Sequence, residues 1–363
     1  MNASLLSARV DRGLSFLIPQ SLGKQSIVGD IMADQSTDRF TTIAVDALGG
    51  DNAPGVVLEG VQAALAADNT LKVILCGPAD VVEPFAAKND RCVARVTTEF
   101  IDMGEHPAEA VKHKKDSSIV VGCQLVRDGE AQGFFSAGST GACLVAGTLV
   151  IGRSKGVKRP ALATVIPSPV KPVVMCDVGA NADCKPEYLV QFANMATIYA
   201  SKILGIANPK VGLLNIGEED TKGSQFAQEV NALMREQVPN FAGNAEGKDI
   251  MKGTFDVIVT DGFTGNVCLK TIEGTSKVLL SELKGIMKAS LLTKLGAATM
   301  MGGLRGLMDK VNPDAYGGAP LLGVKGACIV GHGSSNAEAI KNGVITTAQT
   351  VRQQVSELIA QTI

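Results

Sequence analysis

The sequence of 363 residues contains no tryptophan, only three tyrosines and only three histidines, and its net charge is −2. Few aromatic rings leave few platforms on which nucleic-acid bases can stack, and the charge balance gives no attraction for a phosphate backbone. No apolar run reaches the roughly 18 residues that a membrane-spanning helix requires. These absences predict no nucleic-acid partner and no transmembrane segment.

Several catalytic and cofactor motifs are also missing. The turn DALGGDNAPG lacks the G-x-G-x-x-G spacing of a dinucleotide site, and no G-x-x-x-x-G-K-[ST] loop or G-x-S-x-G elbow occurs. The eight cysteines form no C-x-x-C pair, and several lie inside apolar runs, which predicts reduced core thiols in a cytoplasmic protein. No carboxylate–histidine cluster suggests a metal site.

After residue 40 the sequence repeats one pattern: a short apolar run, a turn rich in Gly, Asp, Ser and Asn, then an amphipathic helix. Six junctions show it: TIAVDALGGDN, GFFSAGSTGA, VVMCDVGANADCKPE, VGLLNIGEEDTKG, VIVTDGFTGNV and ACIVGHGSSNAEA. Repeated βα units predict an α/β fold, with a Rossmann-like, largely parallel sheet flanked by helices. Residues 1–40 lack the pattern and are interpreted as a flexible N-terminal extension of a domain over 41–363. Pro186 predicts the start of one helix, and a second helix is predicted from Ser335 or Asn336 almost to the C-terminus.

Polar residues in these turns are the candidate site. Because ligands bind beyond the carboxyl ends of parallel strands, we expect the turns to line one crevice. The candidates are Asp46, Gly49, Gly50, Asp51 and Asn52; Ser136, Gly138, Ser139, Thr140 and Gly141; Asp177, Asn181 and Lys185; Lys222; Asp261, Thr264, Gly265 and Asn266; and His332.

These residue types suit an anionic ligand. The segment SAGSTGA offers hydroxyls and close backbone approach at the head of a helix, as a phosphate site would, although its Ser and Thr equally suit ordinary helix caps. Lys185 and Lys222 are placed to neutralise an anion. The three strand-end aspartates either anchor their loops through backbone N–H groups or take part in chemistry. His332 either polarises a carbonyl or carries a proton, or is a structural donor.

The motifs closely resemble a known family. IAVDALGGDNAP, KKDSSIVVG, SAGSTGA, RPALATVIPS, DVGANADCKPEYLVQFA, NIGEEDTKG, VTDGFTGNVCLKTIEG, YGGAPLLGVKG and GHGSSNAEAIKNG occur in the order found in the acyl-acyl-carrier-protein:phosphate acyltransferases, the PlsX family. The resemblance covers about residues 41–363. One departure is Ser139, where the family's loop usually reads Gly-Asn-Thr-Gly; a serine hydroxyl can still donate to phosphate.

The resemblance implies a homodimer with a fold similar to the phosphotransacetylases and isopropylmalate dehydrogenases. The implied reaction is attack of inorganic phosphate on the thioester of fatty acyl carrier protein. The acyl-phosphate product would pass to a membrane glycerol-3-phosphate acyltransferase in phospholipid synthesis. No metal or organic cofactor is implied. Lys222 and Asn266, on the matching TKG and TGN turns, are the expected catalytic pair, which stabilises the oxyanion of the tetrahedral intermediate.

Two surface segments acquire a possible role from this resemblance. Lys112, Lys114 and Lys115 either face the acidic carrier protein or form a solvated charge run. Residues 281–311 are basic and carry apolar residues at helical spacing, which predicts an amphipathic helical hairpin with Gly302 and Gly303 at its tip. This hairpin is expected to rest on an anionic membrane surface, which would make the protein peripherally membrane-associated. The alternative is that the hairpin packs in a dimer.

Two other functions fit the same residues. A short-chain phosphate acyltransferase that uses acyl-coenzyme A would share the fold and the site. A non-catalytic protein that binds the carrier or the membrane would keep the fold and lose the chemistry, and the retained polar turns argue against it.

Overall fold

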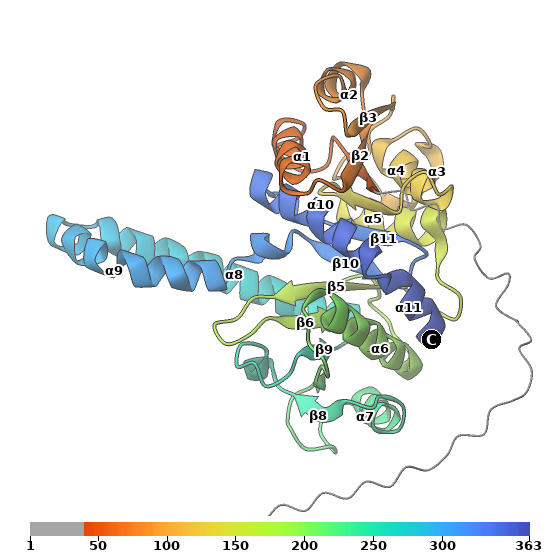
Figure 1. Cartoon of the computed structure of the whole chain (residues 1–363). Coiled ribbons are helices and arrows are strands. Elements are labelled where there is room, and N and C mark those ends of the chain that lie inside the picture. Colours follow the sequence, from red (N-terminus) through yellow and green to blue (C-terminus); the bar gives the residue numbers. More distant parts are fainter. Residues whose placement is uncertain (1–39) are drawn as a thin grey trace, which may run out of the picture. The chain divides into compact units, whose positions relative to one another are not determined.

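The computed structural model describes residues 40–363, which centre on a single sheet of 11 strands (Figure 1). The predicted extension over residues 1–40 lies almost wholly outside the described residues. The strands are β1 (Thr41–Asp46), β2 (Leu71–Gly77), β3 (Cys92–Val96), β4 (Gly133–Ser136), β5 (Ala161–Ile166), β6 (Val173–Cys176), β7 (Val211–Leu214), β8 (Phe241–Ala245), β9 (Val257–Val259), β10 (Ala319–Leu322) and β11 (Ala327–Val330). Their order in the sheet is β3-β2-β1-β4-β11-β10-β5-β6-β9-β7-β8.

Helices follow most strands, as the βα pattern predicts. They are α1 (Gly55–Ala67), α2 (Ala79–Ala86), α3 (Pro107–His113), α4 (Ser118–Arg127), α5 (Thr140–Ala146), α6 (Pro186–Ile203), α7 (Gln225–Gln237), α8 (Gly262–Lys288), α9 (Leu291–Lys310), α10 (Ala337–Arg352) and α11 (Val355–Thr362), with short helical turns η1 (Gly147–Gly152), η2 (Gly247–Ile250) and η3 (Pro313–Tyr316). None of the helices within residues 40–363 is both long and apolar enough to cross a bilayer.

The helix starts follow from their capping residues. Pro186 opens α6, where its missing N–H costs nothing, and the Asn336 side chain caps α10 by accepting from the Ala339 N–H at 2.9 Å. The sequence suggests one helix from there almost to the C-terminus, and that prediction is wrong. Gln354 adopts the left-handed conformation, with φ of 52°, and separates α10 from α11.

Helices cover both faces of the sheet. Along β1, Ile43 and Val45 pack with α1 and α10, while Ala44 between them faces α4 and α5. Along β6, Val174 packs with α6, while Met175 faces the first turns of α8. Side chains of a strand alternate between its faces, so a strand covered on both sides must be apolar throughout, as these are.

The sheet reverses direction near its middle. Strands β3, β2, β1, β4 and β11 are mutually parallel, and so are β6, β9, β7 and β8. Between these groups, β10 is antiparallel to both β11 and β5, and β5 is antiparallel to β6. Three reversals leave the two parallel groups running in opposite directions. The six predicted turns therefore form two clusters, at the carboxyl ends of two oppositely directed strand groups, whereas they were expected to line one crevice.

Helices α8 and α9 form a hairpin that extends away from the sheet (Figure 1). Its turn is at Ala289 and Ser290, where the Ser290 and Thr293 side chains form a reciprocal capping box. Gly302 and Gly303 lie inside α9, so their predicted place at the tip is wrong. Only the base of the hairpin, as far as Ile272 on α8, packs against the core of the sheet.

Candidate active site

Asp177 organises the turn between β6 and α6. Its carboxylate oxygens accept from the backbone N–H groups of Leu162, Gly179, Ala180 and Asn181 at 2.8–3.1 Å, and from Asn181 Nδ2 at 2.8 Å. Burial raises the pKa of Asp177, while these donors act in the opposite direction. Its side chain is fully buried, so its contacts are those of a loop anchor.

The turn after β9 docks on the Asp177 turn. Asp261 caps α8 by accepting from the Thr264 N–H at 2.8 Å and from the Thr264 hydroxyl at 2.7 Å. A side chain at Gly265 would overlap the carbonyl oxygen of Asp177, so only glycine permits this approach. Asn266, next in the helix, is exposed and lies beside Gly179, about 3.8 Å from the place of a Cβ there.

The loop between β7 and α7 carries Lys222 on an exposed turn. Asn215, directly after β7, donates to the Lys222 carbonyl at 3.1 Å and accepts from the Ile216 N–H at 2.8 Å. Gly223 has φ of +91°, and a side chain there would overlap Asn215. Among the residues that the structure describes, no salt bridge involves Lys222. Its ammonium group is thus accessible to an incoming anion.

Two cavities open at this edge of the sheet. One, of about 410 Å³, is lined by Ala182, Asp183, Cys184, Phe226, Asp261, Phe263 and Thr264. The other, of about 440 Å³, is lined by Ile216, Gly217, Glu218, Glu219, Lys222, Glu246 and Lys248. The first joins the turns after β6 and β9 to the start of α7, and its two phenylalanines give it an apolar side.

A second cluster lies at the carboxyl ends of β1, β4 and β11. Asp46 accepts from the Ser136 hydroxyl at 2.7 Å, and the Gly138 N–H donates to the same hydroxyl at 2.9 Å. The Asp51 N–H donates to the Gly333 carbonyl at 2.7 Å, which ties the β1 turn to the β11 turn. Burial raises the pKa of Asp46. Asp46 is also a loop anchor, buried beneath this cluster.

The remaining candidates of the β1 turn surround this network. A side chain at Gly49 would overlap the β4 turn at Ser136, Ala137 and Gly138, so Gly49 permits two loops to touch. Gly50 has φ of +100° and Asn52 is exposed. Gly49 is buried and Gly50 half-buried, so Asp51 and Asn52 are the most accessible of these residues.

The head of α5 is partly covered. The Ser139 hydroxyl accepts from the Ala142 N–H at 3.4 Å as a helix cap, and a side chain at Gly141 would overlap Pro107 of α3. Thr140 remains exposed. Gly141 thus permits α5 to pack against α3. A phosphate at this segment would therefore have to bind at Thr140 and the turn before it.

His332 belongs to this second cluster. Its Nδ1 accepts from the Ser334 N–H at 3.2 Å and lies 2.9 Å from the Ser334 hydroxyl. Since Nδ1 accepts, the proton of the neutral ring lies on Nε2. The imidazole is exposed, and its contacts join it to the β11 turn and not to Lys222 or Asn266. Lys185 is exposed at the start of α6, on the other cluster.

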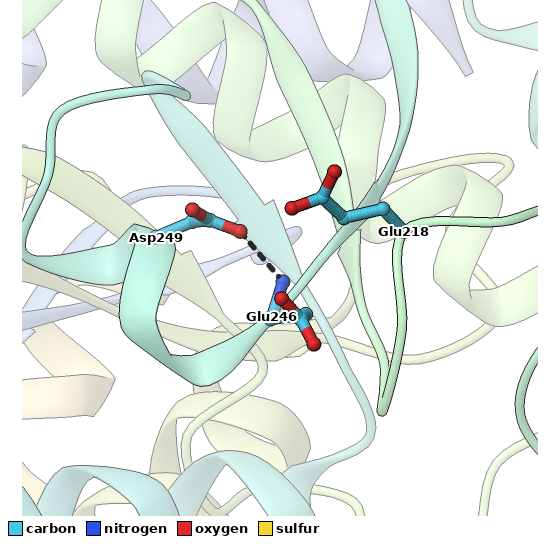
Figure 2. Close-up of side chains that lie close together, drawn as sticks. All are labelled: Glu218, Glu246 and Asp249. Carbon is cyan, nitrogen blue, oxygen red and sulfur yellow. Dashed lines mark hydrogen bonds between the residues drawn. The ribbon is translucent and has the colours of Figure 1, made fainter.

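Three carboxylates beside Lys222 lie close enough to hold a cation: Glu218, Glu246 and Asp249 (Figure 2). Asp249 accepts from the Glu246 N–H at 2.9 Å, which closes a capping box on η2. Lys248 pairs with Glu246 and lies 3.3 Å from Glu218, and Lys252 lies 3.7 Å from Asp249. Lys248 and Lys252 offset two of the three negative charges, and the Asp249 hydrogen bond fixes the start of η2, so we assign the cluster to holding the β8 turn.

The predicted basic segment is only partly available to a partner. Lys114 donates to the Phe100 carbonyl at 2.7 Å and pairs with Glu105 at 2.6 Å, and Lys115 donates to the Val111 carbonyl at 3.0 Å. These contacts fix the end of α3 and occupy two of the three lysines. They favour a structural role for Lys114 and Lys115 over a contact with a partner protein.

Comparison with known proteins places this chain in a family. A family model described as "Fatty acid synthesis protein" matches residues 41–358. A phosphate acyltransferase of Heliobacterium modesticaldum is 46% identical over 326 residues, which are 88% of this chain and 97% of that protein. The chain belongs to the PlsX family of phosphate acyltransferases. Another member, from Bacillus cereus strain B4264, is 43% identical over 319 residues, 88% of this chain and 97% of that one.

Family membership makes the chain an acyltransferase, as the motifs predicted. Solved structures share its fold at low identity. A phosphotransacetylase from Streptococcus pyogenes has a TM-score of 0.57 at 17% identity, covering 86% of this chain and 94% of that chain. A branched-chain phosphotransacylase from Enterococcus faecalis V583 has a TM-score of 0.53 at 15% identity, covering 86% and 99%. The expected likeness to the phosphotransacetylase fold is confirmed.

Sequence reasoning missed residues around both proposed catalytic side chains. Asn215 holds the Lys222 loop, and its place directly after β7 was a usable signal. Phe226 and Phe263 line the cavity between the turns, but isolated phenylalanines at helix starts carry no sequence signal of this. Asn231 and Asn244 lie on a helix and on the strand after it, and nothing in the sequence indicates that the two side chains meet.

Proposed function

We propose that the protein transfers a fatty acyl group from the thioester of an acyl carrier protein to inorganic phosphate. The products are an acyl-phosphate and the free carrier thiol. The observation that carries this proposal is that Lys222, in the turn after β7, and Asn266, near the start of α8 after β9, are both exposed beyond the carboxyl ends of neighbouring parallel strands. A cavity of about 410 Å³ beside the turns after β6 and β9 has the apolar Phe226 and Phe263 on its lining.

The chemistry needs few functional groups. An oxygen of phosphate attacks the thioester carbonyl carbon and forms a tetrahedral intermediate. The carbon–sulfur bond then breaks, and the proton of the phosphate goes to the departing thiolate. Phosphate is already an anionic nucleophile, so positioning and stabilisation of the developing oxyanion are the main tasks. In this proposal the Lys222 ammonium and the Asn266 amide supply that stabilisation, and the exposed Thr264 and Lys185 of the same cluster are candidate phosphate contacts.

An assay with palmitoyl carrier protein and inorganic phosphate tests the proposal. We expect acyl-phosphate, trapped as a hydroxamate, to form in equal amount to the released carrier thiol. Activity with acetyl- or butyryl-coenzyme A and none with the carrier protein would replace the proposal by a short-chain acyltransferase. Carrier binding without acyl-phosphate would instead indicate a non-catalytic protein.

We further propose that the hairpin of α8 and α9 brings the enzyme to an anionic membrane surface, where a glycerol-3-phosphate acyltransferase would consume the product in phospholipid synthesis. Its tip exposes Ile286 (62%), Leu292 (82%) and Leu295 (68%). Lysines flank these residues at Lys284, Lys288 and Lys294. Apolar side chains beside basic ones are the pattern of helices that bind anionic lipid at the interface.

Substituting the hairpin tip is expected to abolish membrane binding. Leu292→Glu with Leu295→Glu removes apolar contact and adds two negative charges near the lipid. The variant should therefore no longer float with vesicles of anionic phospholipid. Leu304→Glu, half-buried on α9 and farther from the tip, should have a smaller effect. The turnover of soluble substrate should not change.

A matched control is Leu149→Glu, which alters an equally exposed leucine (72%) on η1, away from the hairpin. This variant should float like the unmodified protein. If the tip variant still floats, the membrane proposal is wrong. If the tip variant instead sediments as a monomer where the unmodified protein is a dimer, the apolar hairpin serves the proposed homodimer.

A further inference from the structure

The loop that carries Lys222 is held by side-chain amides on three sides. Asn215 donates to the Lys222 carbonyl at 3.1 Å, Gln228 donates to the Thr221 carbonyl at 2.8 Å, and Asn244 donates to the Glu219 carbonyl at 2.8 Å. The Lys222 N–H closes the turn by donating to the same Glu219 carbonyl at 3.0 Å. The backbone of this exposed turn is thus fixed by groups outside it.

One of these amides is the end of a buried chain of hydrogen bonds. Asn244 on β8 and Asn231 on α7 are only 5% and 3% exposed. Asn231 Nδ2 donates to Asn244 Oδ1 at 2.9 Å, and Arg235 Nε donates to Asn231 Oδ1 at 3.0 Å. Arg235 also pairs with Asp220 of the Lys222 loop. The chain therefore starts at a surface guanidinium, passes through two amides, and ends at the Glu219 carbonyl.

Both ends of this chain of hydrogen bonds contact the loop that carries Lys222. Every donor and acceptor direction is set, because each amide accepts through its oxygen and donates through its nitrogen. Two buried amides are costly unless they are fully bonded, and apolar side chains would fill the same space without that cost. Their use at this place indicates a requirement for a defined position of the Glu219 to Lys222 turn.

We propose that Asn231 and Asn244 are positioning residues, which act through the Lys222 turn to hold the ammonium group where the oxyanion forms. This inference rests on the proposed function, since it assigns Lys222 its task. The pair touches neither substrate nor reacting atoms. A displacement of about 1 Å in a reacting group can lower turnover by about 10²-fold, so a loosened turn should affect kcat more than KM.

Two readouts on Asn244→Ala test the proposal in the full-length protein. Hydrogen exchange should become about fivefold faster or more at the amides of 216–223, where one hydrogen bond is lost, and stay unchanged along β1 and β4. The kcat for acyl-phosphate formation should fall by about 10-fold to 100-fold, with KM for the carrier substrate within about twofold. Asn231→Ala should give the same pattern, and the double variant should be no worse than either single one, because all three break one chain.

Asn89→Ala is the matched control. Asn89 is half-buried and its Nδ2 donates to the Phe85 carbonyl at 2.9 Å, near the opposite edge of the sheet. It should leave kcat and the exchange of 216–223 unchanged. Should Asn244→Ala fail to fold, Arg235→Gln alters the exposed end of the chain and should shift both readouts in the same direction by a smaller factor.

Three outcomes would overturn the inference. Unchanged exchange at 216–223 means that the pair does not hold the turn. Faster exchange spread over the whole sheet means a general loss of stability. Faster local exchange with unchanged kcat means that the turn is held but its position is irrelevant to the reaction. Hydrogen exchange needs no substrate. If the proposed function is wrong, the first two outcomes can therefore still be measured, and they are distinguishable from that failure.

Discussion

Replacing Lys222 with alanine is expected to lower the rate of acyl-phosphate formation by about 10²-fold or more, with the fold intact. The side chain is exposed, and among residues 40–363 no salt bridge includes it, so its removal leaves no buried charge behind. Its loop is held through backbone carbonyls by Asn215 and Asn244, which the substitution does not touch. Steady-state kinetics with palmitoyl carrier protein, together with thermal unfolding, measures both halves of this expectation.

Lys248→Ala supplies the matched control for this variant. Lys248 lines the same cavity of about 440 Å³, and it already pairs with Glu246 and lies near Glu218. Losing it should change turnover by no more than about fivefold, since an exposed ion pair contributes at most about 1 kcal/mol. Asn266→Ala should resemble Lys222→Ala. Near-normal activity of Lys222→Ala, or an equal loss in Lys248→Ala, would remove Lys222 from the catalytic role.

The local elements of the fold were predictable because their signals are local. A β-branched run that ends in a glycine turn predicted β1 and α1, and Pro186 predicted the start of α6. The direction of the sheet was not predictable in this way. It depends on pairings such as that of β10 with β5, whose partners lie more than 150 residues apart, and no turn motif encodes them.

Two local sequence signals within residues 281–311 predict different positions for the turn of the hairpin. Gly302 and Gly303 suggested a break, yet α9 continues through both, since glycine lowers helix stability by about 1 kcal/mol and does not forbid a helix. The actual turn carries Ser290 and, three residues later, Thr293, which satisfy one another's backbone N–H groups. Reading the capping pair instead of the glycines would have placed the tip correctly.

The loop-anchoring role of the strand-end aspartates was predictable from the sequence, and the residues that support the Lys222 loop were not. The anchoring role suggested for Asp46, Asp177 and Asp261 agrees with their contacts, because an aspartate directly after a strand faces the free N–H groups of the next turn. Asn231 lies in mid-helix and Asn244 in mid-strand, where an asparagine signals nothing by itself. Their partnership exists only once α7 and β8 pack together.

Asp177→Asn is expected to lower the free energy of unfolding by about 3 kcal/mol. Every hydrogen-bond partner of this carboxylate is an N–H group: four from the backbone and one from Asn181. An amide keeps one acceptor oxygen and turns its own N–H₂ toward the donors of Asn181, so at least one buried backbone N–H loses its partner. Because α8 packs on the same turn through Gly265, the loss should also weaken the position of Asn266. Urea unfolding at pH 7.5 measures the change.

The same chemical change at Asp261 should behave differently. Asp261 caps α8 through the Thr264 N–H, and asparagine is nearly as good a helix cap, so Asp261→Asn should cost about 0.5 kcal/mol or less. Both substitutions remove one carboxylate charge from a strand end. A difference between their free energies of unfolding therefore reports the number of N–H donors on the carboxylate and not the loss of charge. Equal stability of the two variants would mean that the Asp177 turn tolerates an unpaired donor, and the loop would then need another anchor.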